Sequence, residues 1–303
     1  MSTLQFPTKY DDYFRLGLDS YQQQDYYKAI EYLMSAYKMK QNMEIHRFMI
    51  QCSIELEDYN EAKALFLEEK HKYLKSDEGV ELYFSLLCET REWITARIIL
   101  NKNPILQRQL DKLDYLEHTD AIYHKKELNK LSIKLKESLH STVAYQIANF
   151  KQVVYLPLEQ FVSLCDELLS NEHLNLLVRS DLLFTLIDLE YADTIQYLDI
   201  FEKSQDVIPV NLHDKLKHSE YQKFSYFILN HLDSKPTLRE EMRILLPLIY
   251  NLLLPDIEQY MQNYQSLAYA LIDELENQKK YHKNYDNDSQ RLAQKIMKLL
   301  MTM

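Results

Sequence analysis

Apolar residues recur along most of the chain at intervals of three or four positions, the spacing that places them on one side of an α-helix. Near the N-terminus this helical pattern is itself repeated. The three segments that align are FRLGLDSYQQQDYYKAIEYLMSAY, FMIQCSIELEDYNEAKALFLEE and YFSLLCETREWITARIILNKNP. Self-similarity at a fixed period is the sequence signature of stacked structural repeats. Each segment therefore predicts one pair of helices.

Three kinds of residue recur 33 or 34 positions apart in these segments: an aromatic residue, an alanine and a bulky apolar residue. They are Tyr26, Ala29 and Leu33 in the first segment, Tyr59, Ala62 and Phe66 in the second, and Trp93, Ala96 and Leu100 in the third. An acidic residue comes directly before each aromatic one and can cap the second helix of the pair. The alanine allows two helices to approach closely, and the bulky residue fills the groove between them.

These residues, together with Leu16, Gly17 and Ala36, resemble the tetratricopeptide repeat over residues 10–104. The resemblance implies an all-α superhelix of helix pairs, in which the first helices line a concave groove that binds a protein or peptide. The later repeats depart from the family pattern. The glycine position holds Ile50 and Phe84, and the position of Ala36 holds Glu69 and Asn103.

The resemblance assigns seven positions to the predicted groove. They are Phe14, Leu18 and Tyr21 in the first repeat, Arg47 and Gln51 in the second, and Glu81 and Ser85 in the third. Chaperone-binding members of the family grip an acidic C-terminal carboxylate there with lysines and asparagines. Because Phe14 and Leu18 occupy those positions here, we expect an apolar or basic peptide segment instead. The alternative interpretation is that another part of the chain covers Phe14, Leu18 and Tyr21.

After residue 104 the repeat pattern ends, and three further segments are predicted. Residues 105–155 form connecting helices, residues 156–280 a leucine-rich helical domain, and residues 281–303 a charged linker and a C-terminal helix. The expected helices span residues 119–140, 174–189, 220–232, 238–254, 257–278 and 290–300, the last capped by Ser289. The helix at 174–189 is apolar on nearly every side, which predicts a central position.

One segment, near residues 194–210, departs from the helical pattern. A β-branched and aromatic run, Thr194 to Phe201, is separated by polar residues from Val207 to Val210, which predicts a β-hairpin. Pro209 would confine the second strand to an edge, and a short helix is the alternative. This order of elements is similar to the C-terminal part of uncharacterised TPR-repeat proteins from low-GC Gram-positive bacteria, a family that implies no particular activity.

Composition narrows the fold class and the partners. The chain of 303 residues has only two glycines, Gly17 and Gly79, which argues against sheet-rich folds and glycine-rich phosphate loops. Its net charge of −11 disfavours nucleic acid and anionic membranes as partners. The N-terminus lacks the apolar segment of a secretion signal, and the apolar stretch Ile244–Leu254 is too short for a membrane span. The three cysteines are odd in number and far apart, as expected for reduced thiols. These features predict a cytoplasmic protein.

The sequence shows no constellation of catalytic or metal-ligating residues, so we expect neither an enzyme nor a metal or other cofactor. The ten histidines are dispersed, and His213–Asp214 lacks the further ligands that a metal phosphohydrolase needs. Asp11 and Asp12 are expected to stabilise the start of a helix. The cysteines lack the electropositive neighbours of a reactive thiol.

The leading hypothesis is therefore a non-enzymatic adaptor or scaffold that binds a protein or peptide through the repeat groove. A peptide-sensing regulator without a DNA-binding domain and an enzyme with an unrecognised site are the alternatives. RNA binding through two basic faces is the least favoured hypothesis. These faces consist of Lys126, Lys130 and Lys134, and of Arg291, Lys295 and Lys298. The sequence leaves open the identity of the partner and whether the chain forms a homo-oligomer.

Overall fold

A computed structural model describes residues 9–212, 219–278 and 280–301. The chain divides into two compact units, unit 1 (Met1–Thr119) and unit 2 (Asp120–Met303). Both consist almost entirely of helices, and the only sheet in the described ranges has two strands. The expected all-α helical-repeat fold is thus confirmed. None of the described helices is long and apolar enough to cross a membrane.

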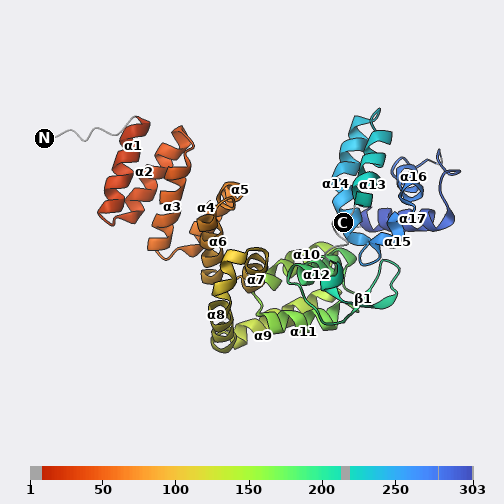
Figure 1. Ribbon diagram of the computed structural model, residues 1–303, viewed down its shortest axis with the longest axis horizontal. Coiled ribbons are helices and arrows are strands. Elements are labelled where there is room, and N and C mark those ends of the chain that lie inside the picture. The colour runs from red at the N-terminus through yellow and green to blue at the C-terminus, as the bar shows by residue number, and fades with distance from the viewer. Residues whose placement is uncertain (1–8, 213–218, 279, 302–303) are drawn as a thin grey trace. The chain divides into compact units, whose positions relative to one another are not determined.

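Unit 1 contains three successive helix pairs, coloured from red to orange in Figure 1. The pairs are α1 (Tyr10–Gln22) with α2 (Tyr26–Met39), α3 (Met43–Glu55) with α4 (Tyr59–Glu68), and α6 (Asp77–Glu89) with α7 (Trp93–Lys102). A short helix, α5 (Lys70–Tyr73), joins the second and third pairs, and η1 (Pro104–Gln109) leads into α8 (Leu110–Tyr123). The two helices of each pair contact each other, and successive pairs are also in contact.

The turn inside each pair has the same backbone conformation. The residue that precedes the N-cap of the second helix has a positive φ, which is 61° at Gln24, 58° at Glu57 and 59° at Arg91. Neither glycine has a positive φ. The scarcity of glycine therefore did not exclude turns of this kind, because residues with side chains adopt the conformation instead.

Two of the three predicted acidic caps are present. Asp25 and Asp58 each accept the backbone N–H three positions further on, at 3.3 Å and 3.1 Å. The equivalent Glu92 makes no cap hydrogen bond to α7 and forms an ion pair with Lys63 of α4. The side chain of Glu92 in the third turn therefore contacts the preceding repeat and does not cap its own helix.

The residues that recur in the sequence form the core of unit 1. The alanine and bulky positions of all three repeats are buried in one cluster: Ala29, Leu33, Ala62, Phe66, Ala96 and Leu100. Leu106 of η1 and Leu113 of α8 are buried in the same cluster. The first compact unit therefore extends beyond residue 104, where the sequence pattern placed its end.

Unit 2 contains further helices and one hairpin. Its further elements are α9 (Lys125–Glu137), η2 (Ser138–His140), α10 (Val143–Phe150), η3 (Lys151–Tyr155), α11 (Leu158–Leu168), α12 (Leu176–Asp188), β1 (Ile195–Leu198), β2 (Ser204–Val207), η4 (Pro209–Leu212), α13 (Ser219–His231), α14 (Pro236–Leu252), α15 (Ile257–Met261), α16 (Tyr264–Leu275) and α17 (Asn287–Met301). Most of α12 is buried, and it contacts α10, η4 and α14, which confirms its predicted central position.

Two helices that were expected to be continuous are each divided. The helix at residues 119–140 is replaced by α8 and α9, because His124 leaves the helical conformation with φ −107° and ψ 19°. The helix at residues 257–278 is replaced by α15 and α16. The break there includes Asn263, whose side-chain amide donates to Asp286 at 3.2 Å. In both places the spacing of apolar residues did not predict the break.

The predicted hairpin is confirmed, but its second strand differs. β1 and β2 are antiparallel, with Ile195 opposite Val207 and Leu198 opposite Ser204. The sequence placed the second strand at Val207–Val210, whereas β2 ends at Val207. Pro209 has no N–H for a strand ladder and begins η4 instead. The second strand therefore begins with three polar residues, of which Ser204 and Asp206 are exposed.

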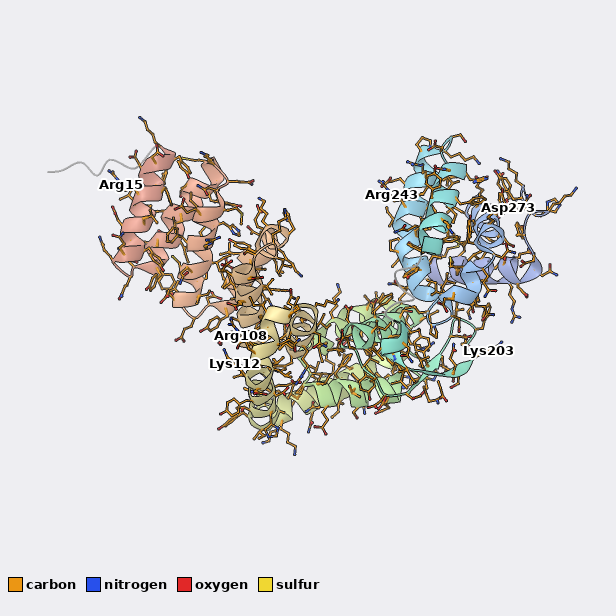
Figure 2. All side chains as sticks on the ribbon, viewed as in Figure 1. Arg15, Arg108, Lys112, Lys203, Arg243 and Asp273 are labelled. Atoms are coloured by element: carbon orange, nitrogen blue, oxygen red, sulfur yellow. The ribbon has the colours of Figure 1, made fainter. Side chains whose placement is uncertain are left out.

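The loop of the hairpin is closed by one carboxylate. Asp199 is buried, and its Oδ1 accepts the backbone N–H groups of Phe201 and Lys203, both at 2.8 Å. Glu202 lies between them with a φ of 63°. These contacts hold the loop that Figure 2 marks with Lys203.

The segment that was expected to be a charged linker is held against α16. Asp273, labelled in Figure 2, is buried and accepts the N–H of Tyr281 at 2.9 Å and the hydroxyl of Tyr285 at 3.2 Å. Asp286 caps α17 in place of Ser289, because its Oδ1 accepts the N–H of Ser289 at 2.7 Å. This hydrogen bond is the main cause of the lowered pKa of Asp286. The C-terminal helix also packs on α16 and so belongs to unit 2.

All three cysteines are buried free thiols, and we expect them to be unreactive. Burial raises the pKa of Cys52 and Cys88 to about 11 and raises that of Cys165 well above its ordinary value. Because the thiolate is the nucleophile, iodoacetamide at pH 8 should leave the folded chain unmodified and alkylate all three thiols in denaturant. Intact mass measurement counts the adducts. A stoichiometric adduct on the folded chain would contradict the expectation.

Candidate binding surface of the repeats

The seven predicted groove residues lie on the first helices of the three pairs. Phe14, Leu18 and Tyr21 are on α1, Arg47 and Gln51 on α3, and Glu81 and Ser85 on α6. Arg47, Gln51 and Ser85 are exposed, and the other four are half-buried. Every one of these positions is therefore at least partly open to solvent. We call this set of seven residues the repeat surface.

The positions on α1 are shared between the surface and the core. The ring of Phe14 lies 6.1 Å from that of Tyr10, measured between centroids. Tyr21 makes edge-to-face contacts with Tyr26 at 5.7 Å and with Phe48 of α3 at 5.4 Å. Both Phe14 and Tyr21 pack against the buried cluster of unit 1 while part of each remains accessible. Such contacts hold the rings in place, which lowers the entropy lost when a partner binds.

The positions on α3 present a cation and an amide. Arg47 is exposed, whereas the adjacent His46 is completely buried and its Nδ1 lies 2.9 Å from the hydroxyl of Tyr73. Burial raises the pKa of Tyr73 to about 12, and the charge of Arg47 opposes this rise. Gln51 lies one turn further along α3 and is also exposed. This part of the repeat surface therefore offers one positive charge and one hydrogen-bonding group.

The positions on α6 carry no unpaired charge. Glu81 forms an ion pair with Arg108 of η1, which is labelled in Figure 2. Ser85 lies one turn further on and is exposed. Because Arg108 neutralises the carboxylate, the attraction of this region for a basic peptide is reduced. The repeat surface is thus aromatic at α1, and Arg47 on α3 is its exposed cation.

A hollow of about 660 Å³ in unit 2 was not foreseen from the sequence. It lies between the hairpin and helices α15, α16 and α17, and its acidic lining residues are Asp199, Asp256, Asp286 and Asp288. Three of these carboxylates are used internally. Asp256 accepts from the side chain of Gln205 at 2.7 Å, Asp286 caps α17, and Asp199 closes the hairpin loop. No sequence motif contains these residues, because they come together only when the hairpin packs against the helices.

The other candidate sites from the sequence do not form a reactive cluster in the part of the chain that is described. Among those residues no group of three or more His, Cys, Asp or Glu could hold a metal ion. His213 and Asp214 lie outside the described residues. Asp11 and Asp12 are in the first turn of α1, as expected. The basic residues of α9 are exposed: Lys126, Lys130 and Lys134.

The repeat surface therefore combines held aromatic rings, one exposed cation and exposed polar groups on three packed helix pairs. No family model matches the chain, and no curated protein or solved structure matches it.

Proposed function

We propose that the chain is a non-enzymatic adaptor or scaffold of the cytoplasm that binds a protein or peptide segment through the repeat surface. The observation that supports this function is the accessibility of all seven positions on α1, α3 and α6, in front of a core made by the recurring residues. The resemblance of these helix pairs to tetratricopeptide repeats belongs to the same proposal. Three buried thiols are compatible with a reducing compartment.

The partner segment that fits the repeat surface best is apolar and carries a hydrogen-bond acceptor or a carboxylate. Phe14, Leu18 and Tyr21 offer apolar contact area with little side-chain entropy to lose. Arg47 can donate to an acceptor on the partner, since it is exposed. A basic segment is the weaker match, because Glu81 is already paired with Arg108.

Site-specific photocrosslinking tests this function. A photoreactive amino acid at Gln51 or Ser85 should crosslink a partner protein in native cells, because both positions are exposed on first helices. The same amino acid at Lys38 of α2 or Ala64 of α4 is the matched control, since these exposed positions lie on second helices. Crosslinked partners are then identified by mass spectrometry.

The substitution Arg47→Glu should lower the crosslinking yield from Gln51 by about tenfold, because it replaces a donor cation with a carboxylate at the centre of the surface. Its circular dichroism spectrum should match that of the parent, since the side chain is exposed. Equal crosslinking yields of the same partner from the first and the second helices would contradict the assignment of the repeat surface as the binding site. An unchanged crosslinking yield in the Arg47→Glu variant would show that Arg47 does not contribute to partner binding.

A further inference from the structure

Helix α17 carries three cations on one side, next to the tip of the hairpin. Arg291, Lys295 and Lys298 are separated by four and three positions, the spacing of neighbours on a helix face. A hollow of about 320 Å³ lies against this face. Its lining residues are Phe201, Glu202, Arg291, Gln294, Lys295 and Lys298. We call this set the basic hollow, and it stands out in a chain whose net charge is −11.

Arg291 is held in position by an aromatic ring. Its guanidinium carbon lies 5.2 Å from the centroid of Phe201, a cation–π contact. Phe201 is fixed in turn, because its backbone N–H donates to the buried Asp199 at 2.8 Å. A stacked guanidinium keeps its N–H edges free for a planar acceptor such as a carboxylate. In the described part of the chain no carboxylate forms an ion pair with Arg291.

Lys295 already holds a carboxylate in the basic hollow. Its Nζ donates to Oε1 of Glu202 at 3.1 Å, and the side chain of Glu202 is 62% exposed. An exposed ion pair of this kind is weak and exchanges readily with a competing carboxylate. Lys298 is exposed, and within the described ranges it has no carboxylate partner of its own. Glu202 thus occupies the place that an acidic side chain of another molecule could take.

We propose that the basic hollow binds an Asp- and Glu-rich segment of a partner protein. One carboxylate of the segment pairs with Arg291, a second pairs with Lys298, and a third replaces Glu202 on Lys295. This is a second binding surface, on unit 2, and it does not depend on the function proposed for the repeat surface. The three cations and the single, exchangeable carboxylate of the hollow supply the charge complementarity.

An acidic peptide fits these observations better than RNA. Recognition of single-stranded RNA uses aromatic rings on which bases stack. Phe201 is the one ring among the described residues that line the hollow, and Arg291 already covers one of its faces. The net charge of −11 also repels a uniformly charged phosphate backbone more strongly than a short peptide with a few carboxylates.

Fluorescence anisotropy with the full chain tests the proposal. The probes are a short labelled peptide of alternating Asp and Glu, its Asn and Gln counterpart, and an oligouridylate of equal charge, all at low salt. The double variant Arg291→Glu, Lys298→Glu should weaken binding of the acidic peptide by about tenfold or more. Glu202→Gln should strengthen it by about threefold, because it removes the competing carboxylate without changing the shape of the side chain.

The charge-matched control is the double variant Lys126→Glu, Lys130→Glu on the exposed face of α9. It changes the net charge by the same amount but leaves the hollow intact. If the hollow is the site, binding of the acidic peptide should therefore stay within about twofold of the parent. Lys298→Glu alone, at an exposed position, replaces the first double variant if that variant loses its helical spectrum. The proposal is overturned if both double variants weaken binding equally, if the acidic peptide does not bind, or if the oligouridylate binds more tightly.

Discussion

Replacing Gly79 by alanine is expected to destabilise unit 1 by about 3 kcal/mol, although alanine is the better helix former. Gly79 lies in the first turn of α6, where a Cβ would be 2.0 Å from the carbonyl oxygen of Tyr73 and 2.6 Å from its carbonyl carbon. Both atoms belong to the backbone, so α5 and α6 would have to move apart. Trp93 is the single tryptophan of the chain and is buried in unit 1, so its fluorescence during urea unfolding measures the loss.

Gly17→Ala is the matched control for this clash. A Cβ at Gly17 would lie 2.7 Å from Cδ2 of Leu33 and 2.8 Å from its Cγ, which are side-chain atoms that can move in part. The gain in helix propensity offsets some of the strain, and we expect a net loss of about 1 kcal/mol. A loss at Gly79→Ala no greater than the loss at Gly17→Ala would show that α6 accommodates the methyl group.

The second large effect is expected from Arg179→Met in unit 2. Arg179 is a residue of α12 that is 2% exposed. Its guanidinium donates to three backbone carbonyls at 3.1, 2.7 and 3.0 Å, those of Leu198, Asn171 and Leu174. Methionine fills most of the volume but removes the donor to the carbonyls of the buried residues Leu174 and Leu198. The carbonyl of Asn171 keeps the backbone N–H of Leu174, at 3.2 Å. Burial also lowers the pKa of Arg179, because a desolvated cation is unfavourable, and removing the cation recovers part of the cost. We expect a net loss of about 3 kcal/mol.

Thermal unfolding followed by circular dichroism measures this loss, and hydrogen exchange locates it. Exchange should rise first around β1 and the segment between α11 and α12, because Arg179 joins these segments. Arg243→Met is the control, at a site on α14 that Figure 2 labels. The Arg243 side chain is 65% exposed and lies 3.7 Å from Glu240, so its loss should cost no more than about 0.5 kcal/mol. Equal transition temperatures for the two variants would contradict the structural role of Arg179.

The repeats could be read from the sequence because the residues that recur are the ones that pack. Ala62 and Phe66 are buried for the same reason that they repeat, since each lies where two helices meet. The turns could not be read in this way. The scarcity of glycine gave no indication of a positive φ in the turns, yet Gln24, Glu57 and Arg91 adopt it. The packing of the helices on both sides outweighs a local cost of about 1 kcal/mol per turn.

In unit 2 the buried helix could be predicted from the sequence, whereas the helix breaks and the hairpin register could not. The apolar helix α12 and the existence of a hairpin followed from residue patterns alone. The register of the hairpin depended on Asp199, which closes the loop, and on Pro209, which ends the strand ladder. Two expected helices were each divided, at His124 and near Asn263, because the spacing of apolar residues does not mark a short break in the backbone. Periodicity therefore reports which residues are inside more reliably than where a helix ends.

The repeat surface could likewise be predicted only in part. The period of the repeats predicted which helices carry Arg47 and Gln51, and both residues are exposed there. The pairing of Glu81 with Arg108 joins residues 27 positions apart and lies outside the repeat pattern, so its effect on the charge of the surface could not be foreseen. The basic hollow required the hairpin tip to meet α17, a contact between segments that are distant in the chain.

The burial of every thiol makes the chain convenient for spectroscopy. A maleimide dye or a spin label should attach only at a cysteine introduced on the surface, so the native Cys52, Cys88 and Cys165 can stay in place. Positions such as Gln51 and Lys298 could then be labelled one at a time. With Trp93 as an intrinsic fluorophore, partner binding at each surface could be followed by separate optical signals in an otherwise unaltered molecule.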